Sequence, residues 1–183
     1  MCPWDSSIVE KQVGIDGGIT LQQKVTVPRG GTAKFRLKIR NVGTVPITNI
    51  KIVDILPAPT DIGVVSCTGR GSLFNVDLNA PLVAPMGGSV AYSSLINPCR
   101  AADLCSNTNC PGCGVTTWTD PWTAARSFKI NYGTFILTPN QILTDDFDVT
   151  VPLTAVKGQS ACNSFGYCAR RTNTNIYALA AEN

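Results

Sequence analysis

The most constraining feature of this sequence is a nine-residue segment, residues 32–40. Within it, Ala33, Phe35, Leu37 and Ile39 alternate with lysine and arginine residues. Successive side chains of a β-strand point to opposite faces of a sheet, so a period of two indicates a strand with one apolar and one basic face. We therefore predict a half-buried β-strand here.

Other segments follow related patterns. The alternation recurs at residues 128–132 and 147–151, and runs rich in β-branched residues occupy residues 19–27, 47–54 and 61–66. Turns with glycine, proline and asparagine separate these segments, and no window combines a helical period with helix caps. Short strands at this spacing are typical of a sandwich or barrel. At 183 residues, the whole chain (1–183) is predicted to form one all-β domain.

Residues 97–124 do not fit this pattern. They contain four cysteines, two tryptophans and three prolines, with little periodicity. A structureless loop of this length inside a compact domain is normally functional or covalently tied down. We expect an insertion that projects from one edge or end of the sandwich and is stapled by its own cysteines, Cys99, Cys105, Cys110 and Cys113.

The chain has eight cysteines, which indicates a disulfide framework and an oxidising final location. Cys162 and Cys168 lie six residues apart on one predicted strand, so they cannot readily reach each other. Cys67, which follows the predicted strand 61–66, is the preferred partner of Cys162. Cys2 precedes the first strand, where a thiol can reach a neighbouring subunit, and is predicted to form an intermolecular disulfide.

The cysteines of the insertion also raise the alternative of a Cys₄ zinc site. Successive thiols are separated by five, four and two residues, an irregular spacing for such a site. Cys110 and Cys113 form a Cys-x-x-Cys pair, but a redox site of this kind needs a helix N-terminus to lower the thiol pKa. Disulfides are the favoured interpretation, and no metal is predicted.

Two blocks of the sequence resemble a conserved-repeat domain that is common in bacterial cell-surface proteins. The first extends from Gly30 to Pro57 and includes the Asn41-Val42-Gly43 turn and a strand ending in Asp-x-Leu-Pro. The second, residues 161–167 followed by residues 179–182, is similar to the closing strand of the longer family members. Cys162 stands where that family usually has tryptophan.

The resemblance extends to the segments between these blocks. Residues 127–132 and 147–152 lie where the family places two core strands, and residues 9–11 match its opening strand. The resemblance implies an immunoglobulin-like antiparallel β-sandwich with the cysteine-rich loop as an insertion. It also implies a role as a stalk, spacer, adhesin or fibre subunit.

The resemblance also raises the hypothesis of an isopeptide bond. Pilin and adhesin sandwiches of Gram-positive bacteria can join a first-strand lysine to a last-strand asparagine, with a buried acid as proton shuttle. The corresponding residues here are Lys11, Asn163 and Asp54. The chemistry requires a neutral amine, an amide that loses ammonia and a carboxyl whose pKa is raised by burial. The favoured interpretation is the simpler one, in which Lys11 is a solvated strand residue and Asn163 is a turn or hydrogen-bonding residue.

Several functional classes find little support. The chain has no histidine, the commonest general base, and no motif marks another catalytic constellation, so we expect neither an enzyme nor a cofactor. The net charge of +3 is too small to suggest nucleic-acid binding. No apolar run is long enough to span a membrane. Asp145, Asp146 and Asp148 lack the glycine-containing loop of a dedicated calcium site.

Two surface features leave alternatives open. The basic row on residues 32–40 either binds a polyanion such as a wall polysaccharide or forms a solvated face opposite Asp146 and Asp148. Trp118 and Trp122 are candidate ligand or interface aromatics. They either stack on a carbohydrate, seal the insertion onto the sandwich or become buried between subunits.

The charged fraction of 15% is below the roughly 25% typical of soluble domains, which suits a protein that packs against neighbours. The sequence therefore favours a structural, self-associating subunit of an extracellular or spore-surface bacterial filament, stapled by disulfides. The alternative is a surface adhesin or carbohydrate-binding module. The first residues lack the parts of a secretory signal, so we expect either a removed signal or release by lysis of a mother cell.

Overall fold

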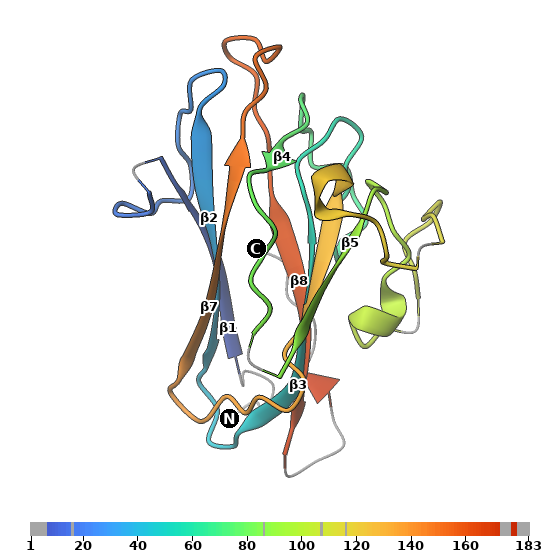
Figure 1. Cartoon of the computed structure of the whole chain (residues 1–183). Helices are drawn as coiled ribbons and strands as arrows, with labels where there is room; N and C mark the ends of the chain where they lie inside the picture. The colour runs from blue at the N-terminus through green and yellow to red at the C-terminus, as the bar shows by residue number, and fades with distance from the viewer. Residues whose placement is uncertain are drawn as a thin grey trace.

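The computed structural model describes residues 7–15, 17–85, 87–106, 108–115 and 117–172, together with the backbone of residues 177–178. Cys2 and residues 179–182, for which predictions were made above, lie outside the described residues. Two antiparallel sheets form a sandwich (Figure 1). The first sheet contains β1 (Ser7–Gly14), β2 (Thr32–Asn41), β7 (Ile142–Thr150) and β4 (Asp77–Leu78), in that order. The second contains β5 (Ser89–Ser93), β6 (Ser127–Asn131), β3 (Ile47–Ile55), β8 (Ser164–Arg171) and β9 (Tyr177–Ala178), in that order.

The order of the strands is that of an immunoglobulin-like sandwich. In the first sheet, β1, β2, β7 and β4 occupy the places of strands A, B, E and D. In the second sheet, β3, β8 and β9 occupy those of strands C, F and G. Strands β5 and β6 extend the second sheet on the side of β3. The predicted fold class is therefore confirmed.

The alternation in residues 32–40 has the predicted structural consequence. Strand β2 pairs with β1 on one side and β7 on the other, and its apolar residues face the second sheet. Three of its basic residues form ion pairs with acidic residues of the neighbouring strands: Lys34 with Asp148 at 2.9 Å, Arg36 with Asp146 at 2.6 Å and Lys38 with Glu10 at 3.2 Å. Arg40 lies opposite Ile8 and Ile142. The basic row thus forms a partly solvated face with acidic partners on the neighbouring strands, which was one of the two alternatives.

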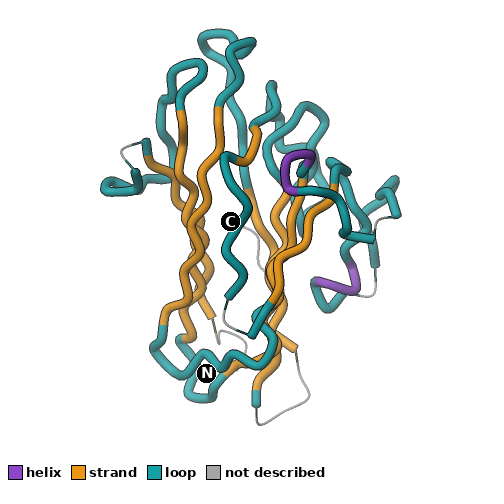
Figure 2. The backbone as a smooth tube through the Cα atoms, viewed as in Figure 1, coloured by secondary structure: helices purple, strands orange, loops and turns teal. Residues whose placement is uncertain are grey.

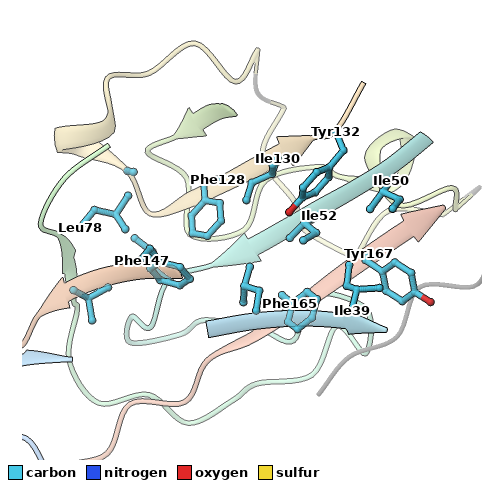
Figure 3. Packing of buried hydrophobic residues seen from close by; sticks show 14 of the residues in the cluster. Ile39, Ile50, Ile52, Leu78, Phe128, Ile130, Tyr132, Phe147, Phe165 and Tyr167 are labelled. Atoms are coloured by element: carbon cyan, nitrogen blue, oxygen red, sulfur yellow. The ribbon is translucent and has the colours of Figure 1, made fainter. Parts of the chain in front are cut away.

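The main core lies between the two sheets (Figure 3). The inward residues of both sheets contribute large, fully buried side chains, among them Phe128, Tyr132, Phe165 and Tyr167. The ring of Phe147 on β7 packs edge-on against that of Phe128 on β6, with centroids 5.1 Å apart, and so joins the two layers. Such buried apolar contacts between layers supply the main favourable free energy of folding.

Two predicted strands are absent. Residues 19–27 form a loop that is anchored to β1 through backbone hydrogen bonds between Val13 and Gln22, and its Val25 and Val27 pack on the main core. Residues 61–66 form turns with a single bridge, Ile62 to Gly69. Val64 is buried and Val25 and Val27 are half-buried, whereas Ile19 and Val65 are exposed, so burial accounts for only part of the β-branched pattern.

The cysteine-rich insertion lies elsewhere than expected. It contains two short 3₁₀ turns, η1 (Ala101–Asp103) and η2 (Trp122–Ala124), within a long loop (Figure 2). It does not project from an edge or end but folds over the outer face of the second sheet. There Trp118 and Leu104 pack with Val53 and Ile55 of β3 in a second apolar cluster. The outward Val53 and Ile55 at the end of β3 are apolar, and the insertion covers them on this face.

The disulfides connect the insertion to the sandwich. Cys99 pairs with Cys113 within the insertion, Cys110 with Cys67, and Cys105 with Cys168 on β8. The predicted pairing of Cys67 with Cys162 is wrong. Cys162 precedes β8 and is exposed, outside any disulfide, whereas the loop that carries Cys67 lies against the insertion, next to Cys110.

Candidate functional site

Lys11 occupies an inward position of β1. Its neighbours at i±2, Val9 and Val13, pack on the main core, so strand alternation places the lysine side chain between the sheets. Lys11 is only 6% exposed. Its Nζ lies 5.1 Å from the ring centroid of Phe35 and 5.3 Å from that of Phe147, with Phe165 at 6.0 Å. Three aromatic rings therefore shield this amine from water.

Asp54 is the acidic partner of Lys11. It continues the inward row of Ile50 and Ile52 on β3 and is fully buried. Its Oδ2 accepts a hydrogen bond from Lys11 Nζ across the sandwich. Within the described residues its Oδ1 has no hydrogen bond of normal geometry. One oxygen of the carboxyl is thus committed to the lysine, and the other remains available.

Asn163 immediately precedes β8, where the register of the sheet brings Asp54 opposite Phe165. The Asn163 Nδ2 atom is buried and, among the described residues, has no hydrogen bond of normal geometry. Its Oδ1 accepts a hydrogen bond from Arg70 at 3.3 Å. The amide lies close enough to Asp54 to lower the pKa of that carboxyl. Lys11 and Asn163 also line the same groove, of about 1270 Å³.

Burial dominates the ionisation of the pair. Loss of hydration lowers the pKa of Lys11 to about 8, although the charge and hydrogen bond of Asp54 act in the opposite direction. Burial likewise raises the pKa of Asp54, and Lys11, Arg70 and Asn163 partly offset this rise. Desolvation disfavours both charges at once. The two shifts bring the pKa values of the amine and the carboxyl closer together, which makes proton transfer from Lys11 Nζ to Asp54 easier.

The arrangement contains every group needed for an intramolecular isopeptide bond. Lys11 supplies the nucleophilic nitrogen and Asn163 the carboxamide carbon. Asp54 Oδ2 can accept the proton from Nζ, and a carboxyl so placed can deliver a proton to Nδ2 of Asn163. The C–Nδ2 bond then breaks, ammonia leaves and the carbonyl is restored. Holding the three groups in one buried site lowers the entropic cost of such a reaction.

Arg70 and Asp61 complete the surroundings of this site, and sequence analysis did not single out either of them. Arg70 lies in a Gly-Arg-Gly turn without periodicity, so nothing local indicates that its side chain is buried. Its Nη2 donates to Asp61 Oδ2 at 2.7 Å and to the Ile55 carbonyl at 2.8 Å. Asp61 is itself fully buried and accepts from Ser72 Oγ at 2.6 Å.

The other predicted site residues are spread over the molecule. Trp118 is buried between the insertion and β3, with Lys129 Nζ 5.1 Å from its ring centroid. Trp122 is half-buried against the main core. All four cysteines of the insertion are in disulfides, so they do not form a zinc site. In the described residues, no group of three or more metal-ligating side chains is present and no helix could cross a membrane.

Comparison with known proteins identifies no relative by sequence. No family model and no curated protein matches the chain. Similar solved structures include the full-length major pilin SpaD from Corynebacterium diphtheriae, with 12% identity and a TM-score of 0.46, covering 96% of this chain. The chain spans only 34% of that pilin.

A second similar structure is an uncharacterized protein from Nocardia farcinica with an immunoglobulin-like fold. It shares 10% identity with this chain at a TM-score of 0.37, and the match covers 85% of this chain and 76% of that protein. Both likenesses are too distant to carry a function.

Proposed function

We propose that this chain is a structural, self-associating subunit of an extracellular or spore-surface filament, whose sandwich is locked by an isopeptide bond between Lys11 and Asn163. The observation that carries the proposal is the buried trio of Lys11, Asp54 and Asn163. Burying the charge of a lysine on an apolar strand face costs free energy unless that charge is paired. The bond would convert that costly ion pair into a neutral, permanent cross-link.

The position of the bond suits a load-bearing role. Lys11 lies on β1, the first strand, and Asn163 lies at the start of β8 in the opposite sheet. A covalent link between Lys11 and Asn163 would prevent the two sheets from separating where these two residues lie. Three disulfides add cross-links over the outer face of the second sheet and indicate an oxidising environment. Such redundancy favours a durable scaffold over a catalyst.

The proposed family relationship and surface location support the same role. The Asp-x-Leu-Pro strand that resembles the bacterial surface repeat ends at the site, because its aspartate is Asp54. The rival role, a carbohydrate-binding module, depended on Trp118 and Trp122 as a platform. Trp118 is 7% exposed, so it cannot offer its ring to a sugar.

Negative-stain electron microscopy of the purified chain tests the assembly part of this proposal. We expect fibres that persist in heat and detergent. The N163A variant should form fibres that disassemble at a lower temperature, because it keeps the Lys11–Asp54 pair but cannot form the bond. Monodisperse particles under all conditions would contradict self-association, even if the isopeptide bond is present.

A further inference from the structure

Arg70 contacts the oxygen on which negative charge would develop during isopeptide formation. When an amine attacks the Asn163 carboxamide, the electron pair of the C=O bond moves onto Oδ1. The Nη1 group of Arg70 donates a hydrogen bond to this same Oδ1 at 3.3 Å. We propose that Arg70 is a catalytic residue of this reaction, the oxyanion donor that polarises Asn163. This inference rests on the proposed isopeptide bond.

The Arg70 guanidinium is held before the reaction begins. Its Nη2 group is fixed by Asp61 Oδ2 at 2.7 Å and by the Ile55 carbonyl at 2.8 Å. The side chain is only 7% exposed. A donor that is already in place and shielded from water stabilises a developing charge without reorganisation, the condition under which such donors are most effective.

The Asp61 carboxylate is fixed in turn by its own loop. Asp61 Oδ2 accepts from Ser72 Oγ at 2.6 Å and from the Ala58 backbone N–H at 3.1 Å. Charge on Arg70 is therefore compensated on the Nη2 side, away from Asn163. The Nη1 side faces the Asn163 amide and the Ser164 hydroxyl, at 3.3 and 3.4 Å. The Nη2 group therefore anchors the guanidinium, and the Nη1 group contacts the reacting amide.

The reaction balances with the groups present. Lys11 Nζ forms a bond to Asn163 Cγ, and the carbonyl electron pair moves to Oδ1, where Arg70 stabilises it. Asp54 takes the proton from Nζ and gives one to Nδ2. When the carbonyl re-forms, the Cγ–Nδ2 bond breaks and ammonia leaves. The positive charge of Arg70 also lowers the pKa of Lys11, which favours the nucleophilic form of the amine.

Substitution of Arg70 tests this role. In R70M we expect bond formation to slow by about 10²-fold, the usual effect of losing one oxyanion donor, so that freshly purified protein lacks most of the cross-link. In R70K, which keeps a positive donor, the rate should recover in part. The readout is the time course of ammonia loss, by intact mass of reduced, denatured protein. R126M is the matched control, since Arg126 pairs with Asp77 away from the site.

Two further variants distinguish catalysis from structure. D61N weakens the anchor of Arg70 but leaves the Nη1 donor, so it should lower the unfolding temperature while the cross-link still forms. N163D keeps Arg70 in place but offers it a carboxylate. Arg70 would hold that group ionised and unreactive, so no water should be lost.

The outcomes separate the two proposals. A parent-like rate of cross-linking in folded R70M would overturn the role of Arg70. A parent-like rate of cross-linking in N163D would also overturn it, and this second measurement can be made even if R70M fails to fold. Absence of the bond in the parent protein would instead overturn the proposed function itself.

Discussion

At the residue scale, the feature that best indicates the candidate site is a lysine on an apolar strand face. The inward positions of β1 are Val9, Lys11 and Val13, so the alternation alone places Lys11 against the core, and the resemblance supplies Asp54 and Asn163 as its partners. The structure brings these three residues together around one carboxyl. Arg70 could not be predicted, because its burial depends on how the loop before it folds back onto β3.

Asp145 is a half-buried acid outside this site, and it has a predictable effect on stability. It lies on the inward row of β7 with Phe147, and its Oδ2 is buried with no hydrogen bond among the described residues. Burial, followed by the charge of Asp146, raises the pKa of Asp145 to about 6. The folded protein thus retains a proton that the unfolded chain releases near its ordinary pKa of about 4.

The sign of the pH dependence follows from this difference. As pH rises from about 4 to 6, the unfolded chain binds fewer protons than the folded one, so the contribution of Asp145 to stability falls and stays low above pH 6. We expect D145N to stabilise the protein by about 1–2 kcal/mol at about pH 7.5 and by little at about pH 4. Urea unfolding at both pH values measures this, with D77N as an exposed control. An equal effect at both pH values would contradict the account.

At the element scale, the strands with one buried face were predictable and the path of the insertion was not. The alternation in β2 and β7 encodes their burial directly. The end of β3 and the residue after it read Ile52-Val53-Asp54-Ile55-Leu56, which is apolar except for Asp54, and the outward Val53 and Ile55 are both fully buried. A run of this kind is typical of a strand covered on both faces, and this signal indicates that something must cover β3.

The disulfides cannot be assigned from the same information. Pairing depends on where loops lie in three dimensions, and Cys168 points outward from β8 toward Cys105 of the insertion. Gly166, two residues earlier on the same face, permits this approach. A Cβ at Gly166 would lie 2.9 Å from Cγ1 of Val64 and 3.2 Å from Cδ1 of Leu104. Close packing of the insertion on β8 therefore requires glycine at this position.

The disulfides should differ in their contributions to stability. Cys105–Cys168 spans 63 residues and Cys99–Cys113 spans 14, and a longer closed loop restricts the unfolded chain more. We expect C105S/C168S to lose about 1 kcal/mol more than C99S/C113S, because the cost grows with the logarithm of loop length. Guanidinium unfolding compares the two variants. Equal losses would show that local packing outweighs the loop effect.

At the scale of the whole molecule, the proposed bond would close the longest loop of all. Lys11 and Asn163 are 152 positions apart (163 − 11). By the same loop-closure argument, the cross-link would stabilise the sandwich by about 4–5 kcal/mol. Together with the disulfides, it would leave few parts of the sandwich able to unfold independently.

The N163A variant tests this contribution. It should unfold about 10–20 °C below the parent, given the temperature shift per kcal/mol for a chain of this size. N75A is the matched control, because Asn75 is exposed, and it should unfold at the parent temperature. A loss of only a degree or two in N163A would mean that no cross-link exists between the sheets.

The proposed covalent bond between Lys11 and Asn163 can be detected in the intact mass of the parent protein. The protein should be fully reduced and denatured first, so that disulfides do not affect the mass. We expect a mass lower than that of the sequence by one ammonia, together with a branched tryptic peptide that joins the segments around Lys11 and Asn163. A mass equal to that of the sequence, with trypsin cleaving after Lys11, would contradict the proposed bond.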